Sequence, residues 1–122
     1  MDERLEEFTL EGKNFFYLDL GRIRKNSEFL KLRAYAKPIL AKYERKSVYA
    51  IFNLENILFD TETKGIFEQW GDYNRTYFKY LAVMEIDGIK KIMFAPLFKK
   101  YGSRFNTFYT KEQALEWLLQ QE

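Results

Sequence analysis

Apolar residues along this chain follow two spacings, one typical of buried strands and one typical of helices. Two nearly continuous apolar runs, at residues 48–54 and 80–86, have the character of strands buried on both faces of a parallel sheet. Around them, apolar residues recur every three to four positions, which predicts helices beginning near Ser27 and near Asp60. We expect the two strands to be neighbours in one parallel sheet, because a strand–helix–strand unit forms a right-handed crossover.

Turn and capping residues mark the elements at both ends of the chain. Near the start, two short strands flank a loop centred on Gly12, which predicts an antiparallel hairpin. Near the end, a short strand at residues 105–109 precedes a last helix. Thr110 and Gln113 form a Thr-x-x-Gln capping box for that helix, whose apolar face predicts that Trp117 is largely buried.

This order of elements predicts one α/β domain over residues 1–122. The chain is 47% hydrophobic and 31% charged, which is typical of a soluble globular protein. No apolar run approaches the roughly 20 residues that span a bilayer. Residues 1–7 are acidic and lack the apolar stretch of a secretory signal, so we expect a cytoplasmic location.

The composition removes most catalytic chemistry. The chain has no cysteine and no histidine, which excludes thiol nucleophiles, His-based triads and the usual zinc ligand sets. Its carboxylates show no calcium-loop spacing, and no serine stands in a Gly-x-Ser-x-Gly elbow. We therefore expect a non-enzymatic protein with no cofactor and no bound metal.

The segment from Tyr77 to Leu119 is the most specific part of the sequence. It reads as an apolar strand, a break at Gly88, a helix, a short strand and a capped helix that ends in Trp117-Leu118. This succession resembles the C-terminal half of small stand-alone STAS-like domains, relatives of the bacterial anti-sigma factor antagonists. The resemblance implies a mixed sheet of four or five strands, with an N-terminal antiparallel hairpin and about four helices mainly on one face. It also implies a protein that acts by binding other proteins, although some related folds bind lipids or small ligands.

The same resemblance draws attention to Asp60 and Thr61. Anti-sigma factor antagonists carry a regulatory serine after an aspartate at the start of a helix, and residues 60–65 occupy the matching place as Asp-Thr-Glu-Thr-Lys-Gly. The resemblance implies phosphorylation of Thr61, where a phosphate would meet free N–H groups and the positive end of the helix dipole. The alternative is that Asp60 or Thr61 only caps the helix.

The helix after Gly88 is the candidate contact surface. It is apolar over more than half of its circumference, and residues 88–111 contain several lysines and no acid. An exposed aromatic patch with a basic rim predicts a homodimer or a complex with an acidic protein. The alternative is that the phenylalanines pack within the domain. The candidate residues are Lys90, Lys91, Phe94, Phe98 and Lys99.

Three classes of function remain open at this point, of which a hydrolase-like enzyme is the least favoured because the chain has no His and no Cys. The first is a protein-interaction domain with a regulatory role, and the second is a binder of an apolar or amphiphilic small molecule such as a lipid, because 19% of the residues are aromatic. Nucleic acid binding is disfavoured, since the basic and aromatic segment at residues 99–105 lacks an RNP-type signature. A large enclosed aromatic pocket would favour the ligand, and a filled core with an exposed apolar patch would favour the protein partner.

Overall fold

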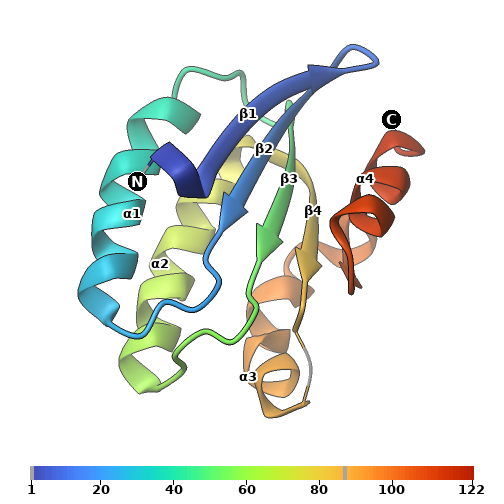
Figure 1. Ribbon diagram of the computed structural model, residues 1–122. Helices are drawn as coiled ribbons and strands as arrows, with labels where there is room; N and C mark the ends of the chain where they lie inside the picture. The colour runs from blue at the N-terminus through green and yellow to red at the C-terminus, as the bar shows by residue number, and fades with distance from the viewer. Residues whose placement is uncertain (1, 87) are drawn as a thin grey trace.

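Five strands form one mixed sheet in the computed structural model, which describes residues 2–86 and 88–122 (Figure 1). The first two strands pair antiparallel, and each later strand adds in parallel to the one before it. This arrangement confirms the predicted hairpin and the predicted parallel neighbours. In sheet order the strands are β1 (Leu5–Leu10), β2 (Lys13–Asp19), β3 (Val48–Asn53), β4 (Phe78–Met84) and β5 (Phe105–Phe108).

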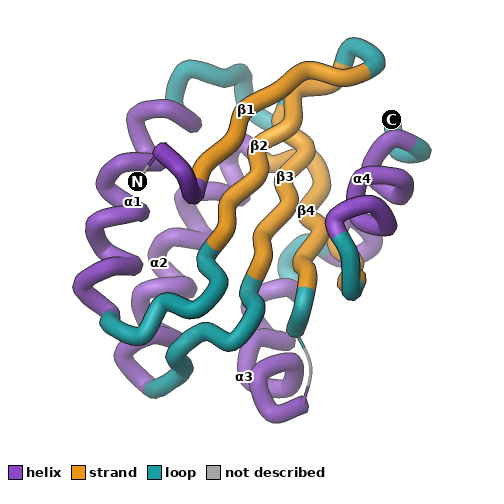
Figure 2. The backbone as a smooth tube through the Cα atoms, viewed as in Figure 1, coloured by secondary structure: helices purple, strands orange, loops and turns teal. Residues whose placement is uncertain are grey.

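Three of the four helices cover one face of the sheet, and the fourth lies on the other face (Figures 1 and 2). The parallel strands advance across the sheet in one direction, so right-handed crossovers place all the connecting helices on the same side. The prediction of helices mainly on one face is therefore confirmed. The helices are α1 (Asn26–Leu40), α2 (Thr61–Tyr77) and α3 (Gly88–Lys99) on the first face and α4 (Lys111–Leu119) on the second, with short 3₁₀ helices at Asp2–Arg4 and Gly102–Arg104.

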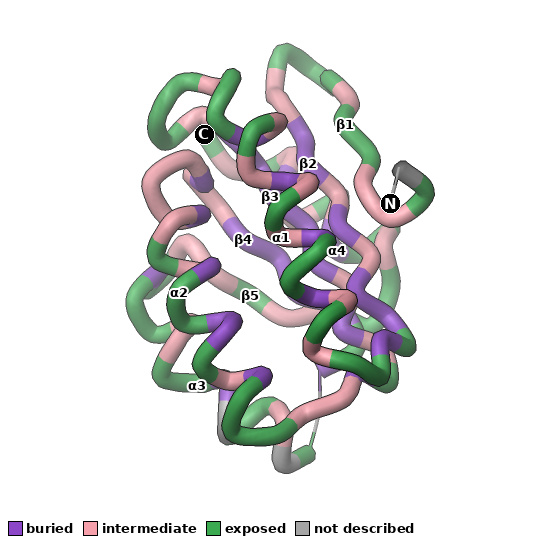
Figure 3. Tube along the Cα trace, turned by 90° about the vertical axis from the view of Figure 1, so that its left-hand side faces the viewer, coloured by how far each residue is buried: buried purple, intermediate pink, exposed green. Residues whose placement is uncertain are grey.

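Alternation along the central strands divides the apolar side chains between two cores. In β3, Ala50 and Phe52 point toward α1, α2 and α3, whereas Tyr49 and Ile51 point toward α4. Figure 3 shows the buried residues concentrated along the strands and on the inner faces of the helices. The larger core also contains Trp70 from α2, whose side chain is only 1% exposed.

Local backbone chemistry explains the hairpin boundary but not the start of α1. Glu11 and Gly12 connect β1 to β2 with φ angles of 51° and 77°, the left-handed values that a two-residue type I′ hairpin needs. The helix predicted to begin near Ser27 begins one residue earlier, at Asn26, so Ser27 lies inside the helix, and the N-cap, Lys25, makes no side-chain cap. Pro38 does not break α1, since it lies in the last turn, where few residues follow it.

The last helix docks as expected at its start but only partly at Trp117. The Gln113 N–H donates to Thr110 Oγ1 at 3.1 Å, and the reciprocal half of the capping box is also present. Ala114 and Leu118 are fully buried against the sheet. Trp117 is only partly buried, because it lies at the margin of α4, where its ring contacts Tyr80 and Phe108. The prediction that Trp117 is largely buried is therefore confirmed only in part.

The two tryptophans should differ in their contribution to stability. We expect Trp70→Ala to lower the free energy of unfolding by about 3–5 kcal/mol, the usual loss for a large aromatic in a packed core. Trp117→Ala should lose about half as much, because part of its ring is already in water. Urea denaturation of both variants measures this difference. Equal losses would show that α4 buries Trp117 as deeply as α2 buries Trp70.

Candidate functional site

Phe94 fastens α3 to the rest of the domain. Its side chain is 0% exposed, and its ring lies edge-on to Phe59 at 4.8 Å and to Phe67 at 5.3 Å between centroids. Phe67 belongs to α2, and Phe59 to the loop before it. The expectation that Phe94 forms part of an exposed patch is therefore wrong, and the alternative that the phenylalanines pack within the domain is confirmed for Phe94. The broad apolar arc of α3 exists partly because this helix packs on α2 as well as on the sheet.

Phe98 continues the same line of rings toward the edge of the sheet. It stacks on Phe94 at 5.7 Å and on Phe105 of β5 at 4.3 Å, with only 13° between the last two ring planes. Phe98 remains partly exposed, unlike Phe94. One end of α3 is therefore held against the edge strand through a ring that also reaches the surface.

A groove of about 320 Å³ runs between α3 and β5 beside this ring. We call it the α3–β5 groove. Most of its lining is apolar, and two lysines stand at its rim. Three of the residues predicted from the sequence meet there, namely Lys91, Phe98 and Lys99, whereas Lys90 and Phe94 do not line it. The residues that line the groove are Ile86, Lys91, Ala95, Phe98, Lys99, Gly102, Phe105 and Thr107.

The outer surface of α3 adds an exposed apolar side chain next to the groove. Ile92 is 74% exposed, and Ala95 and Pro96, one turn further along the same side of the helix, are also exposed. An isoleucine this exposed loses the benefit of burial unless something covers it. Sequence analysis missed Ile92 and Ala95 as contact residues, because it assigned the aromatic side chains of α3 to the surface instead.

The aromatic side chains between α2, α3 and the sheet leave almost no internal space. They line a cavity of about 30 Å³, far below the roughly 300–1,000 Å³ of a pocket for a small-molecule ligand. Tyr101 at the end of α3 is buried beside it, and burial raises the pKa of its hydroxyl, so the group remains a neutral phenol. The aromatic rings that line this cavity include Phe52, Phe67, Trp70, Phe94, Phe98 and Tyr101.

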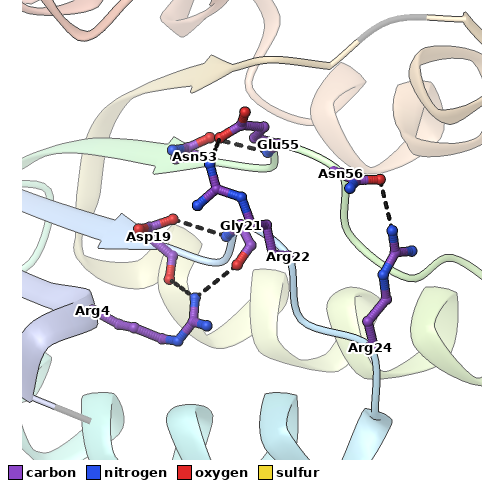
Figure 4. A network of polar contacts seen from close by, with 8 residues as sticks. All are labelled: Arg4, Asp19, Gly21, Arg22, Arg24, Asn53, Glu55 and Asn56. Carbon is purple, nitrogen blue, oxygen red and sulfur yellow. Dashed lines mark hydrogen bonds and ion pairs between the residues drawn. The ribbon is translucent and has the colours of Figure 1, made fainter.

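The carboxyl ends of β2 and β3 carry the same short structural motif (Figure 4). At the end of β2, the Gly21 N–H donates to Asp19 Oδ1 at 2.8 Å, and at the end of β3 the Glu55 N–H donates to Asn53 Oδ1 at 3.0 Å. Each turn is followed by a residue with left-handed backbone angles, Arg22 in the first loop and Asn56 in the second. Short polar side chains that bond the backbone two residues further on are typical of such turns.

Hydrogen bonds join these two loops into one closed layer. The Arg22 N–H donates to the Glu55 carbonyl at 2.8 Å, and the side chains of the same residues form an ion pair at 3.2 Å. Arg24 donates to Asn56 Oδ1 at 2.8 Å, while Arg4 Nη1 donates to the carbonyls of Asp19 and Gly21. At the start of each loop the N–H groups already have partners, those of Leu20, Gly21 and Arg22 in the first and of Leu54 and Glu55 in the second. We therefore interpret this layer as a structural clamp.

Asp60 caps α2, as one of the two interpretations of the sequence predicted. Its Oδ1 accepts hydrogen bonds from the Thr63 N–H at 2.8 Å and the Thr63 hydroxyl at 2.9 Å, and Asn26 donates to the same atom. These bonds, led by the Thr63 N–H, lower the pKa of the Asp60 carboxyl group. Thr61 is exposed as the first residue of the helix, and its phosphorylation stays a prediction.

A basic hollow lies at the end of the sheet opposite the β2 and β3 loops, and the fold itself explains its positive charge. Arg45, Lys46 and Arg75 line it together with Asp72, near the C-terminus of α2. Lys46 donates to the Arg75 carbonyl, and its pKa is lowered by burial and by the charges of Arg104 and Arg75. Cations are favoured at this negative end of a helix dipole, so the cluster needs no external anion.

The described residues offer no metal centre and no membrane span. Within residues 2–86 and 88–122, no three His, Cys, Asp or Glu side chains are placed to hold a metal ion. None of the helices in the same ranges is long and apolar enough to cross a bilayer.

The clamp gives a prediction at Gly21. A Cβ at this position would lie 2.9 Å from Asp19 Oδ1 and 3.4 Å from the Glu55 carbonyl, so Gly21→Ala must displace the Asp19 side chain. We expect a loss of about 1–3 kcal/mol in the free energy of unfolding. Gly65→Ala on α2 is the control, because nothing lies within 4 Å of its Cβ, and it should stabilise by about 0.5–1 kcal/mol. Urea denaturation that shows no loss for Gly21→Ala would contradict the clamp.

The cap gives a prediction with a defined pH dependence. Asp60→Ala should lower the urea midpoint, whereas Thr61→Ala should leave it nearly unchanged, since the Thr63 N–H at the start of the helix bonds to Asp60. The pKa of Asp60 is lowered from the ordinary value of 3.8 in the folded protein. Its contribution to stability is therefore complete above pH 3.8 and is lost as the pH falls through the folded pKa. The difference between wild type and Asp60→Ala should close over that range, and a constant difference would contradict the cap.

Comparison with known proteins shows the fold of this chain and does not show its specific function. No family model matches the sequence, and no curated protein matches it. A solved structure of an uncharacterized protein of the DUF3478 family with a SpoIIAA-like fold, from Shewanella loihica PV-4, is similar with a TM-score of 0.69 and 14% identity, over 93% of this chain and 91% of that one. An anti-sigma-factor antagonist (STAS) domain protein from Planctomyces limnophilus is similar with a TM-score of 0.59 and 9% identity, over 94% and 97%. The chain has the fold of a STAS-like domain.

Proposed function

We propose that this STAS-like domain is a non-enzymatic, cytoplasmic regulatory module that binds another protein through α3 and the α3–β5 groove. The observation that carries the proposal is the contrast between a filled core and an uncovered apolar surface on α3. The aromatic cavity holds about 30 Å³, whereas Ile92 is 74% exposed beside a groove of about 320 Å³. Apolar contact area with a charged rim is the usual composition of a protein interface.

The strand order supports a surface contact over an internal ligand site. In open α/β sheets, small ligands bind in the crevice that forms where the strand order reverses. The parallel strands here run in the single sequence β2, β3, β4, β5, so this crevice is missing from the described sheet. The loops at the carboxyl ends of β2 and β3 are instead tied to each other. These features favour a protein partner over the apolar small molecule that remained open from the sequence.

The fold is consistent with a regulatory interaction. One of the similar structures is described as an anti-sigma-factor antagonist domain, which is a protein that acts on another protein. With 9% identity, that similarity supports the class of function for this chain and leaves the partner open.

The proposal is tested by native mass spectrometry of protein purified gently from the cells that express it. We expect the wild type to carry a second protein and Ile92→Asp to lose it, with binding weakened by about tenfold or more. Because Ile92 is 74% exposed, this substitution should not change thermal unfolding followed by circular dichroism. Leu30→Asp is the matched control, since Leu30 is an exposed aliphatic residue, at 37%, on α1.

Two outcomes would contradict the proposal. One is a wild-type protein that carries no partner. The other is a bound small molecule that stays in Ile92→Asp and leaves only when the protein is denatured, which would support the ligand instead.

A further inference from the structure

We infer that the α3–β5 groove binds an acidic segment of another protein, which inserts one apolar side chain between two carboxylates. This inference rests on the proposed function and specifies its partner. The groove is an apolar depression at the edge of the sheet. The charge at its rim and the exposed edge of β5 limit what can bind there.

The floor of the groove suits one apolar side chain. Phe98 and Phe105 form a stacked pair at 4.3 Å, and Ile86 and Ala95 complete the walls. Ala95 lines the groove on the α3 side with only a methyl group, which leaves more room than a longer side chain would. A branched aliphatic or aromatic side chain placed there would be removed from water on most sides, which is how interface anchors contribute.

The rim of the groove selects negative charge. Lys91 and Lys99 line it and are both exposed. Residues 88–111 contain no Asp or Glu, so no acid within this segment compensates the lysines. Lys91 and Lys99 are eight residues apart on α3, which corresponds to ~12 Å along the helix axis. An extended chain covers that distance in about four residues, so the matching segment has acids four positions apart with the apolar residue between them.

A second copy of this chain fits the groove poorly. If two copies paired antiparallel through their β5 edges, the two sheets would join with the same face on the same side. Both α3 helices, with Lys91 and Lys99, would then lie on that one side. The Thr107 N–H on β5 is also occupied, because it donates to Asn106 Oδ1 at 2.8 Å. Both features oppose pairing of two such edges, as charged and blunted edge strands generally do.

The acidic strand β1 of a second copy is also a poor candidate. It contains Glu6 and Glu7, which could in principle supply the carboxylates. Glu6 already forms an ion pair with Lys111 at 3.1 Å, and Glu7 accepts a hydrogen bond from the Tyr43 hydroxyl at 2.6 Å. If these two carboxylates bound the groove of a second copy, they would lose their contacts with Lys111 and Tyr43 in their own copy. Glu3 and Glu7 have the required spacing with Leu5 between them, but Leu5 packs against the core of its own domain. These contacts favour a different protein as the occupant.

Fluorescein-labelled peptides test the inference directly. The probe is Gly-Glu-Ser-Phe-Ser-Glu-Gly, compared with one peptide in which Lys replaces both Glu residues and one in which Ala replaces Phe. Fluorescence anisotropy should show the probe binding at least about tenfold more tightly than either comparison peptide. Its affinity should fall as salt is added, since exposed charges are screened over about 8 Å at physiological ionic strength.

Variants locate the binding site. Lys91→Glu/Lys99→Glu should weaken the probe by about tenfold or more by reversing the rim charge, and Ala95→Trp should do so by filling the groove. Lys31→Glu/Lys42→Glu is the matched control, because it reverses two exposed lysines outside the groove and should leave binding unchanged. Thermal unfolding followed by circular dichroism confirms that all three variants are folded.

Three results would overturn the inference. The first is no binding of the probe up to about 1 mM, or equal binding of the basic peptide. The second is binding that the groove variants do not change. The third is sedimentation of the isolated wild type as a dimer or larger assembly that Lys91→Glu/Lys99→Glu dissociates, which would make a second copy the occupant. If Ile92→Asp loses the cellular partner and Lys91→Glu/Lys99→Glu retains it, the proposed function stands and only the acidic occupant fails.

Discussion

A continuous line of contacting phenylalanine rings, edge-on at one end and stacked at the other, holds α3 in place, and the geometry of the candidate surface depends on it. The line runs from Phe59 through Phe94 and Phe98 to Phe105, with ring centroids between 4.3 and 5.7 Å apart. Aromatic pairs at these separations add to the free energy of burying their surface. Because the line ends at the edge strand, it sets the spacing between α3 and β5. The groove is the space that this packing leaves open at the surface.

The order of the strands determines which edge of the sheet stays uncovered. Parallel strands that advance in one direction place α1, α2 and α3 on one face, and they bring the loops after β2 and β3 side by side. There the loops exchange backbone and side-chain hydrogen bonds, so their polar groups are used internally. At the opposite end of the sheet, cationic side chains lie near the C-terminus of α2 and compensate the negative end of its dipole. The outer edge, at α3 and β5, keeps apolar side chains without a cover from the described residues.

Most of the fold could be predicted from short-range patterns. The runs at residues 48–54 and 80–86 predicted parallel neighbours, and Gly12 and Thr110 predicted a hairpin and a helix cap that the structure contains. These features depend on contacts between residues close together in the chain, or on a crossover rule that holds for nearly all such units. The start of α1 was misplaced by one residue, because Lys25 at its N-cap makes no side-chain cap there. Without a capping side chain, the local sequence does not mark the residue at which this helix begins.

The candidate surface could be predicted only in part. The charge pattern identified Lys91 and Lys99, because a long segment without acids can be recognised from the sequence alone. The pattern of apolar residues could not separate Phe94 from Ile92, since both lie on a helix that is apolar around most of its circumference. The exposure of each depends on which neighbours meet α3, and Phe59 and Phe67 cover Phe94, while nothing in the described structure covers Ile92. Local sequence determines the identity and order of the elements, because hydrogen bonding and amphipathic spacing act over a few residues. The packing of distant elements determines which apolar face stays in water, because burial is a property of the neighbours as much as of the residue.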